Sequence, residues 1–408
     1  MTIDGAAHYV KPTPRRVSAT DAGYKGLFHL GARDEAAAWR ILQVLPRGMR
    51  YTQSAATSID LYVSEMAAHS RFRVEVMAES SDRPLPAAAV HALPRFAFAE
   101  TQRRSRRVAA VVESLRPAAV VVQQHLPSAA ALRARIAAPI ILQKHNFLRV
   151  SRNVSWLRDA SHWRRARQLN ALAGITFVSR AILAEFERDW PEVTIPRRVV
   201  ANGFDAAAWR PQLARERTVL TVGRATPEKG LLETARALAA ILPRHPDWTA
   251  TFVVSEPGRF PDYFAAIGAA LAPLGPRARL LVGIPYDQVK ALNERSAIAI
   301  APSVWREPFG RTCLEAHAGG AAVVSSGSGG LREISGETAL YLPAVEPGRI
   351  AEAVEALIVQ QPLRERLAAE GRARVERLFD IRRVAAELDD FCAEAIERAR
   401  QPRGATAA

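Results

Sequence analysis

The sequence predicts an α/β protein of two Rossmann-like domains, each a parallel β-sheet covered by helices on both faces. The chain has 408 residues, 49% of them hydrophobic, which exceeds one typical domain and is enough to fill two cores. Short aliphatic runs alternate with segments of helical apolar spacing from residue 39 almost to the end. In such folds ligands bind at the carboxyl ends of the strands, so functional side chains are expected there.

The first half of the chain contains six strand candidates rich in aliphatic and β-branched residues. They are Trp39–Pro46, Phe72–Glu79, Ala118–His125, Pro139–His145, Ile175–Arg180 and Arg198–Asn202. Residues 1–38 lack this rhythm and lack the apolar core of a signal peptide, so we expect them to form a partly disordered extension. The first domain is therefore expected over residues 39–201.

The second half repeats the pattern with a strand beginning at Thr218 and five more candidates. These are Thr249–Ser255, Ala278–Gly283, Ala297–Pro302, Ala321–Ser326 and Ala339–Pro343. The linker lies near Asn202–Trp209, which gives a second domain over residues 202–378. In the remaining segment, 379–408, the helix Ile381–Ala399 is expected to cross back to the first domain.

The most informative stretch is Pro302–Gly330, which sets Glu307 and Glu315 on either side of a strand-to-helix turn at Gly310. Unpaired backbone N–H groups and the positive end of the helix dipole at Gly310, Arg311 and Thr312 attract a phosphate, and glycine lets it approach closely. Carboxylates at such a turn are expected to bind hydroxyl groups. For two glutamates alone, an ordinary solvated pair is the alternative.

This stretch resembles the retaining family 4 glycosyltransferases, whose signature is Glu-x7-Glu within Pro-Ser-x-x-Glu-x-Phe-Gly-x-x-x-x-Glu-Ala. The resemblance implies a GT-B fold, in which two Rossmann-like domains face a cleft, the first binding the acceptor and the second the nucleotide sugar. In that family the first glutamate contacts the donor sugar and the second the ribose. The resemblance assigns these roles to Glu307 and Glu315. It also implies that Phe309 contacts the donor, together with the residues at the helix start.

A second motif, Gly-Arg-x-x-Pro-Glu-Lys-Gly, follows the strand at Thr218 and contains Gly223, Arg224 and Lys229. Two cations facing a diphosphate would hold the donor and stabilise the charge on leaving UDP or GDP. The motif resembles the diphosphate clamp of the same family, and both cations are expected to be exposed. Taken singly, each is a solvated surface residue.

Two further loops bear on the donor. The family loop that contacts the base, chiefly through its backbone, is matched by Gly283, Ile284, Pro285 and Tyr286. Ser255–Gly258, by contrast, departs from the glycine-rich sequence usual after the second strand of this domain.

Candidate residues on the acceptor side are fewer. His125, followed by Leu-Pro, matches a family histidine near the reacting centre and is assigned a catalytic role beside Glu307, Arg224 and Lys229. His145 and Asn146 correspond to a position near the acceptor. Gly48 could allow close backbone approach, although the usual paired glycines are absent. For both histidines, a capped structural residue at a strand end is the alternative.

Charge is unevenly distributed along the chain. Residues 1–185 carry 27 Lys+Arg against 13 Asp+Glu, whereas residues 186–408 carry 29 against 28. An anionic membrane surface or acceptor would explain the excess, with tryptophan beside arginine suited to a headgroup interface. The alternative is a solvated, arginine-biased surface. The densest part comprises Arg149, Arg152, Trp156, Arg158, Trp163, Arg164, Arg165 and Arg167, and the run Arg103–Arg107 is a second candidate.

Neither a cofactor nor a metal is expected. Neither Cys313 nor Cys392 has other metal-ligating residues at a suitable spacing in the sequence. No Asp-x-Asp pair is available to hold a divalent ion on a diphosphate. No apolar window is long enough to span a bilayer. We therefore expect a cytoplasmic enzyme, peripheral at the cytoplasmic face of the inner membrane.

The expected reaction is transfer of a hexose from a UDP- or GDP-sugar to a glycan or glycolipid, with retention of configuration, in cell-envelope polysaccharide or lipopolysaccharide synthesis. The resemblance implies a front-face mechanism, in which the leaving phosphate takes the acceptor's proton. Three alternatives remain: a transferase for a soluble acceptor such as a sugar phosphate, a non-catalytic binding module, and a sugar-nucleotide epimerase. Intact motif residues and missing aromatic RNA-binding motifs argue against the module, including one for nucleic acid.

Overall fold

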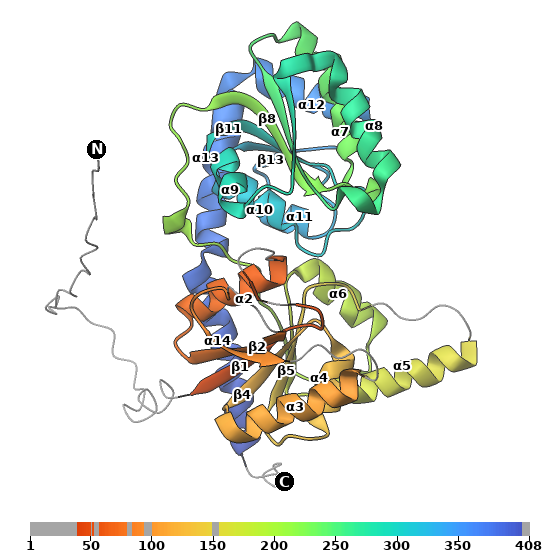
Figure 1. Cartoon of the computed structure of the whole chain (residues 1–408), viewed down its shortest axis with the longest axis vertical. Coiled ribbons are helices and arrows are strands. Elements are labelled where there is room, and N and C mark those ends of the chain that lie inside the picture. Colours follow the sequence, from red (N-terminus) through yellow and green to blue (C-terminus); the bar gives the residue numbers. More distant parts are fainter. Residues whose placement is uncertain are drawn as a thin grey trace, which may run out of the picture.

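The computed structural model describes residues 39–49, 51–52, 57–79, 84–93, 100–148 and 155–401. Two parallel sheets stack end to end with helices around each, which confirms the predicted two-domain α/β architecture (Figure 1). The predicted extension, residues 1–38, lies outside the described residues.

The first sheet has the strand order β3-β2-β1-β4-β5-β6-β7, and all of its pairs are parallel. Its strands are β1 (Arg40–Val44), β2 (Arg73–Glu79), β3 (Ala89–Leu93), β4 (Ala119–Gln123), β5 (Ile140–Lys144), β6 (Gly174–Phe177) and β7 (Arg197–Val199). Six match the predicted candidates to within a few residues. The sequence prediction missed β3, an edge strand in which only Leu93 is buried.

Helices cover both faces of this sheet because its strand residues alternate between two apolar clusters. Leu42 and Val120 pack with one group of helices, whereas Ile41 and Val121 pack with the other. The first group is α3 (Glu100–Leu115), α4 (Leu126–Arg133), α5 (Ser155–Asn170) and α6 (Arg180–Asp189). The second group is α2 (Ser58–His69) and α14 (Ile381–Arg400).

The second sheet has the order β10-β9-β8-β11-β12-β13 and is also parallel throughout. Its strands are β8 (Glu216–Arg224), β9 (Thr249–Ser255), β10 (Ala278–Val282), β11 (Ser296–Ala301), β12 (Ala322–Ser325) and β13 (Ala339–Tyr341). Its α-helices are α7 (Leu231–Ile241), α8 (Pro261–Leu271), α9 (Tyr286–Arg295), α10 (Arg311–Ala318), α11 (Gly330–Ser335), α12 (Pro347–Val359) and α13 (Gln361–Phe379).

The chain passes between the domains twice, and the two crossings touch. Phe204 of the linker forms backbone hydrogen bonds with Phe379 and Ile381, at the break between α13 and α14. The Asp380 side chain accepts a hydrogen bond from the Arg382 backbone at 2.9 Å and so caps α14. Beyond this point α14 packs against α2 and β4, as the sequence predicted for its last helix.

Candidate functional site

The predicted donor-binding residues gather at the edge of the second domain that faces the first. In Figure 1, α10 and α11 lie above α2 and α6 of the first domain. Two ion pairs cross the boundary at or just before the start of α10, because Arg311 pairs with Glu65 and Arg306 pairs with Glu185 at 2.6 Å. Residues of both domains therefore surround the start of α10.

Glu307 and Lys229 form an ion pair in the loops that follow two neighbouring strands. Lys229 ends the short 3-10 helix η2 (Pro227–Lys229) after β8, and Glu307 precedes α10 after β11. The Ser303 hydroxyl donates to the same carboxylate oxygen of Glu307. Three residues separate Ser303 from Glu307, one more than in the family signature quoted above.

The two predicted clamp cations are half-buried, which corrects the expectation that both are exposed. Arg224 is 32% exposed and its guanidinium donates to Glu228 at 3.4 Å, whereas the Lys229 side chain is 19% exposed. The Lys229 ammonium also lies 5.7 Å from the centre of the Trp305 ring. Each cation is therefore paired with a carboxylate in a partly buried place.

Glycine is the only residue type that fits the turn at position 310. Its φ is +102°, and a Cβ built there would lie 2.3 Å from the Leu331 side chain. Phe309, in contrast, lies in the core, with its ring packed edge-on against Phe379 at 5.8 Å. Its predicted donor contact can therefore involve only its backbone. Thr312 follows in the first turn of α10 and is half-buried.

Glu315 is buried one helical turn into α10 and accepts two hydrogen bonds at one oxygen, Oε1. The donors are the Tyr286 hydroxyl at 3.0 Å and Nε of Arg311 at 3.0 Å. Burial raises the pKa of the Glu315 carboxyl, and Arg311 opposes that shift. Tyr286 is the last residue of the predicted base loop, in which Gly283 is exposed with φ of +60° and Ile284 is half-buried.

On the acceptor side, His125 ends the turn between β4 and α4. Its Nδ1 lies 2.7 Å from the Ser128 hydroxyl. Burial lowers the pKa of His125, and the positive charges of Arg47, Arg104 and Lys144 lower it further. The imidazole is therefore neutral near pH 7.

The ring of His145 is engaged within the first domain. Its Nε2 lies 2.6 Å from the side-chain oxygen of Gln123, and burial together with Lys144 lowers its pKa to about 3. Asn146 is exposed, and its backbone N–H donates to Gln124 at 3.0 Å. Gly48 is exposed with φ of +82°, and its N–H donates to Glu79 at 2.7 Å.

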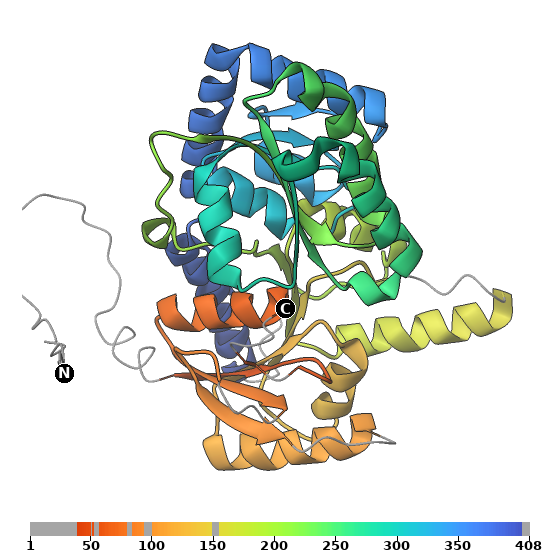
Figure 2. The same cartoon turned by 45° about the horizontal axis from the view of Figure 1, so that its top comes forward.

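The predicted basic surface is described only in part. Arg149 and Arg152 lie outside the described residues, and the side chains of Trp156 and Arg158 in α5 are also outside them. Further along α5, Trp163 is 60% exposed, Arg164 and Arg167 are exposed, and Arg165 is half-buried. Helix α5 extends away from the body of the first domain in both views (Figures 1 and 2).

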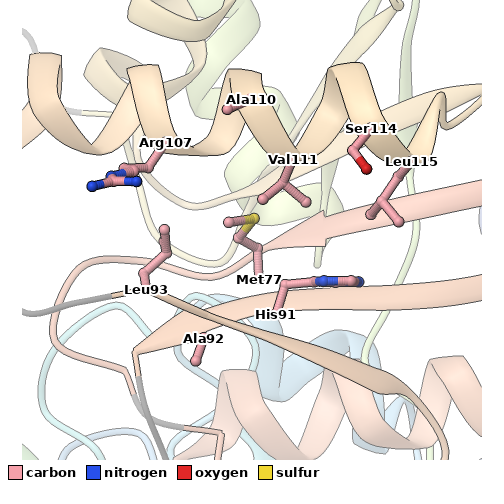
Figure 3. Close-up of a pocket in the computed structure, with 9 residues that line it drawn as sticks. All are labelled: Met77, His91, Ala92, Leu93, Arg107, Ala110, Val111, Ser114 and Leu115. Atoms are coloured by element: carbon pink, nitrogen blue, oxygen red, sulfur yellow. The ribbon is translucent and has the colours of Figure 1, made fainter.

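Two open pockets lie on the outer side of the first domain, away from α10. One, of about 470 Å³, separates α3 from β2 and β3, with Met77 and Val111 facing each other and Arg107 at one end (Figure 3). The other, of about 690 Å³, lies between α4 and α5 and is lined by alanines, Trp163 and three arginines. Neither contains a predicted donor residue.

Sequence reasoning missed Glu65, Ser303 and Trp305, and it quoted Tyr286 only for its backbone. Ser303 and Trp305 stand inside the quoted stretch and could have been considered as supports for Glu307. Glu65 carries no local signal, because it reaches the site only through folding. Among the described residues, no group of three or more metal-ligating side chains occurs, and no helix is long and apolar enough to cross a bilayer.

Comparison with known proteins identifies the second domain. Residues 207–374 match the family model "Glycosyl transferases group 1". The glycogen synthase of Mycobacterium tuberculosis is 33% identical over 212 residues, which are 50% of each chain. A lipopolysaccharide core biosynthesis mannosyltransferase of Rhizobium leguminosarum is 30% identical over 199 residues, 45% of this chain and 55% of the relative. The chain thus spans about half the length of these curated relatives.

The fold similarity extends over both domains. A sucrose-phosphate synthase from Thermosynechococcus elongatus superimposes with a TM-score of 0.70 at 18% identity, covering 88% of this chain and all of the other. A glycosyltransferase from Rickettsia africae gives the same TM-score at 15% identity, covering 88% of this chain and 99% of the other. The fold is therefore GT-B, and residues 207–374, most of the second domain, match the group 1 glycosyltransferases.

Proposed function

We propose that this protein transfers a hexose from a UDP- or GDP-sugar to a glycan or glycolipid acceptor, with retention of the anomeric configuration. The observation that carries the proposal is the convergence of Lys229, Glu307 and Glu315 at the start of α10. This convergence provides a cation for a diphosphate and carboxylates for sugar and ribose hydroxyls, beside a helix N-terminus that favours anions.

In this proposal each residue acts on a different part of the donor. Lys229 and Arg224 exchange their carboxylate partners for the diphosphate and stabilise the charge that develops as it leaves. Glu307, released from Lys229, accepts a hydrogen bond from the sugar, and Glu315 binds the ribose. Neutral His125 contacts the donor sugar from the first domain. The leaving phosphate takes the acceptor's proton, as the family resemblance implies.

The first experiment is a thermal-shift and calorimetry screen of the full chain with UDP, GDP and their sugars. A ligand that binds only the folded state raises the melting temperature, so at least one nucleotide should do so. Lys229→Ala should lower turnover, because it removes roughly 2–4 kcal/mol of transition-state stabilisation. Arg217→Ala is the matched control, because Arg217 lies exposed at the other end of β8 and pairs with Asp247. If no nucleotide binds the folded protein, the proposal is wrong.

The acceptor proposal follows from relatives and charge together. One relative is named as a lipopolysaccharide core mannosyltransferase and another as a glycogen synthase, so a glycolipid and a soluble glucan are both represented. The exposed arginines of the first domain favour the glycolipid. A role in cell-envelope polysaccharide or lipopolysaccharide synthesis is accordingly proposed, with the soluble acceptor as the alternative.

A peripheral contact with an anionic membrane is part of this proposal. Exposed arginines occur on α3 (Arg103, Arg106 and Arg107) and on α5 (Arg164 and Arg167). Apolar side chains line both outer pockets, together with Arg107 in one pocket and three arginines in the other, which also contains the exposed Trp163. Aliphatic surface, tryptophan and guanidinium together suit the boundary between headgroups and acyl chains.

Sedimentation with vesicles containing anionic phospholipid tests this contact at low and high salt. Each arginine near the surface should contribute about 1 kcal/mol of attraction, which salt weakens. The double variant Arg164→Glu, Arg167→Glu should no longer bind the vesicles, while its nucleotide affinity should stay unchanged. The control Arg217→Glu, Arg366→Glu has the same net charge but alters exposed residues of the second domain. If the wild type does not sediment with anionic vesicles even at low salt, the membrane contact is wrong and the alternative of a soluble acceptor is favoured.

A further inference from the structure

The side chain of Arg311 joins the two domains at the candidate ribose site. Its terminal nitrogens donate to both oxygens of Glu65 on α2, at 2.8 and 3.2 Å, a bidentate arrangement. Its Nε donates to Oε1 of Glu315 at 3.0 Å. One guanidinium, 10% exposed, is thus shared between a carboxylate of the first domain and a carboxylate of the second.

Tyr286 completes the arrangement from the start of α9. Its hydroxyl donates to Oε1 of Glu315 at 3.0 Å and accepts from Arg311 at 3.4 Å. Both donors to Glu315 therefore end on the same oxygen. Among the described residues, Oε2 of Glu315 receives no such bond, and it is the oxygen left for a hydroxyl group.

We propose that Glu65 and Tyr286 are positioning residues for the nucleotide, which fix Arg311 so that Glu315 presents Oε2 to the ribose. This inference rests on the proposed function, because it takes Glu315 as the ribose-binding carboxylate. Glu65 does not touch the nucleotide. Since Glu65 belongs to the first domain, the ribose site is complete only while the domains keep this relative position.

The geometry explains why the partner carboxylate matters. A guanidinium released from Glu65 can turn and take both oxygens of Glu315 in a bidentate pair, which would occupy the oxygen that the ribose needs. Other contacts still join the domains, since Glu333 accepts from the backbone N–H groups of Arg180 and Ala181 at 2.8 and 2.7 Å. Loss of the Glu65 charge should therefore alter the ribose site without unfolding the protein.

The test compares UDP with 2′-deoxy-UDP, or the corresponding GDP pair, by calorimetry on the full chain. The wild type should bind the ribonucleotide more tightly than the deoxynucleotide. In Glu65→Gln the ribonucleotide should bind about 5- to 30-fold more weakly, and the preference for ribose should shrink. Glu65→Asp keeps the charge and should restore part of the preference. The control is Glu113→Gln, an exposed glutamate of α3, which should behave as the wild type.

The outcomes separate this inference from the proposal on which it rests. If the wild type binds neither nucleotide, the proposed function fails and the inference fails with it. If the wild type binds but Glu65→Gln keeps its affinity and its ribose preference, only the inference is wrong. Equal weakening of both nucleotides would assign Glu65 a merely structural role and would also overturn it. Tyr286→Phe gives an independent reading, because it removes one donor to Oε1 and should also reduce the ribose preference.

Discussion

Lys229 and Glu307 lie 78 positions apart in the sequence, yet each is the other's ionic partner in the folded chain. In the proposed function, a diphosphate would therefore compete with Glu307 for the ammonium group, and a sugar hydroxyl would compete with Lys229 for the carboxylate. The two residues are thus coupled through one ion pair. It also means that removing either charge changes the state of the other residue.

Substitution of the two glutamates should separate their roles. Glu307→Gln frees Lys229 for the diphosphate, so nucleotide affinity should stay unchanged or rise while turnover falls about 100-fold, within the range for a lost electrostatic contact. Glu315→Ala should instead cost about 1.5–3 kcal/mol of nucleotide binding, since it removes hydrogen bonds to a charged group. Calorimetry and initial rates measure both quantities. Equal losses of affinity in the two variants would count against separate sugar and ribose roles.

The buried Lys144 predicts a specific pH dependence of stability. Burial lowers its pKa to about 8, from 10.5 for an exposed lysine, while its ammonium donates to the Gln124 carbonyl at 3.0 Å. Below pH 8 the folded state must bury a charge that the unfolded state leaves in water. The penalty fades between pH 8 and 10.5, because the folded state loses its proton first.

Lys144→Met should therefore raise the melting temperature at pH 7, and the difference from the wild type should shrink as the pH rises to 10. Thermal unfolding of both proteins across this range is the measurement. A difference that does not depend on pH would show that the variant acts through packing and not through charge.

The proposed donor site depends on the start of α10, where Gly310 forms the turn into the helix. Gly310→Ala would hold alanine at a φ of +102° against Leu331, at a cost of roughly 1–3 kcal/mol. The melting temperature should fall and nucleotide binding should weaken as the turn shifts. In the control Gly348→Ala, the new methyl group meets nothing within 4 Å near the start of α12, and stability should rise by about 0.5–1 kcal/mol. Unchanged stability in Gly310→Ala would contradict this account.

Most strands were predictable from a short aliphatic run, even where few of their residues are buried, whereas β3 was missed. The six residues of β11 are all buried, so their apolar run gave the strand directly. In β3 only one residue is buried, and its pairing with β2 is a long-range event that no local pattern indicates. The motif residues around Gly310 were predictable because they are close in sequence. The partner of Arg311 was not, since 246 positions separate it from Glu65.

At the scale of the whole molecule, the excess positive charge belongs to the domain expected to receive the acceptor. The second domain, with the donor motifs, is nearly neutral and holds its cations in ion pairs such as Arg224 with Glu228. The sequence predicted this asymmetry of charge. It did not predict the pockets beside which the arginines lie, because the pockets beside α3 and α5 arise from helix packing. Donor binding and surface attraction should accordingly respond differently to salt.

Because α14 returns to the first domain, we expect the protein to stay associated after a cut between the domains. Val384, Leu388 and Phe391 of α14 fill the core of the first domain, although they follow the second domain in sequence. A protease recognition sequence placed beside Leu213, which is fully exposed between the linker and β8, would divide the chain into two fragments of similar size. The seven-stranded sheet of the first fragment would still be covered on one face by α14 of the second fragment. The nicked protein should therefore elute as one species in size-exclusion chromatography and come apart only in denaturant, and the first fragment expressed alone should fail to fold until the second is supplied.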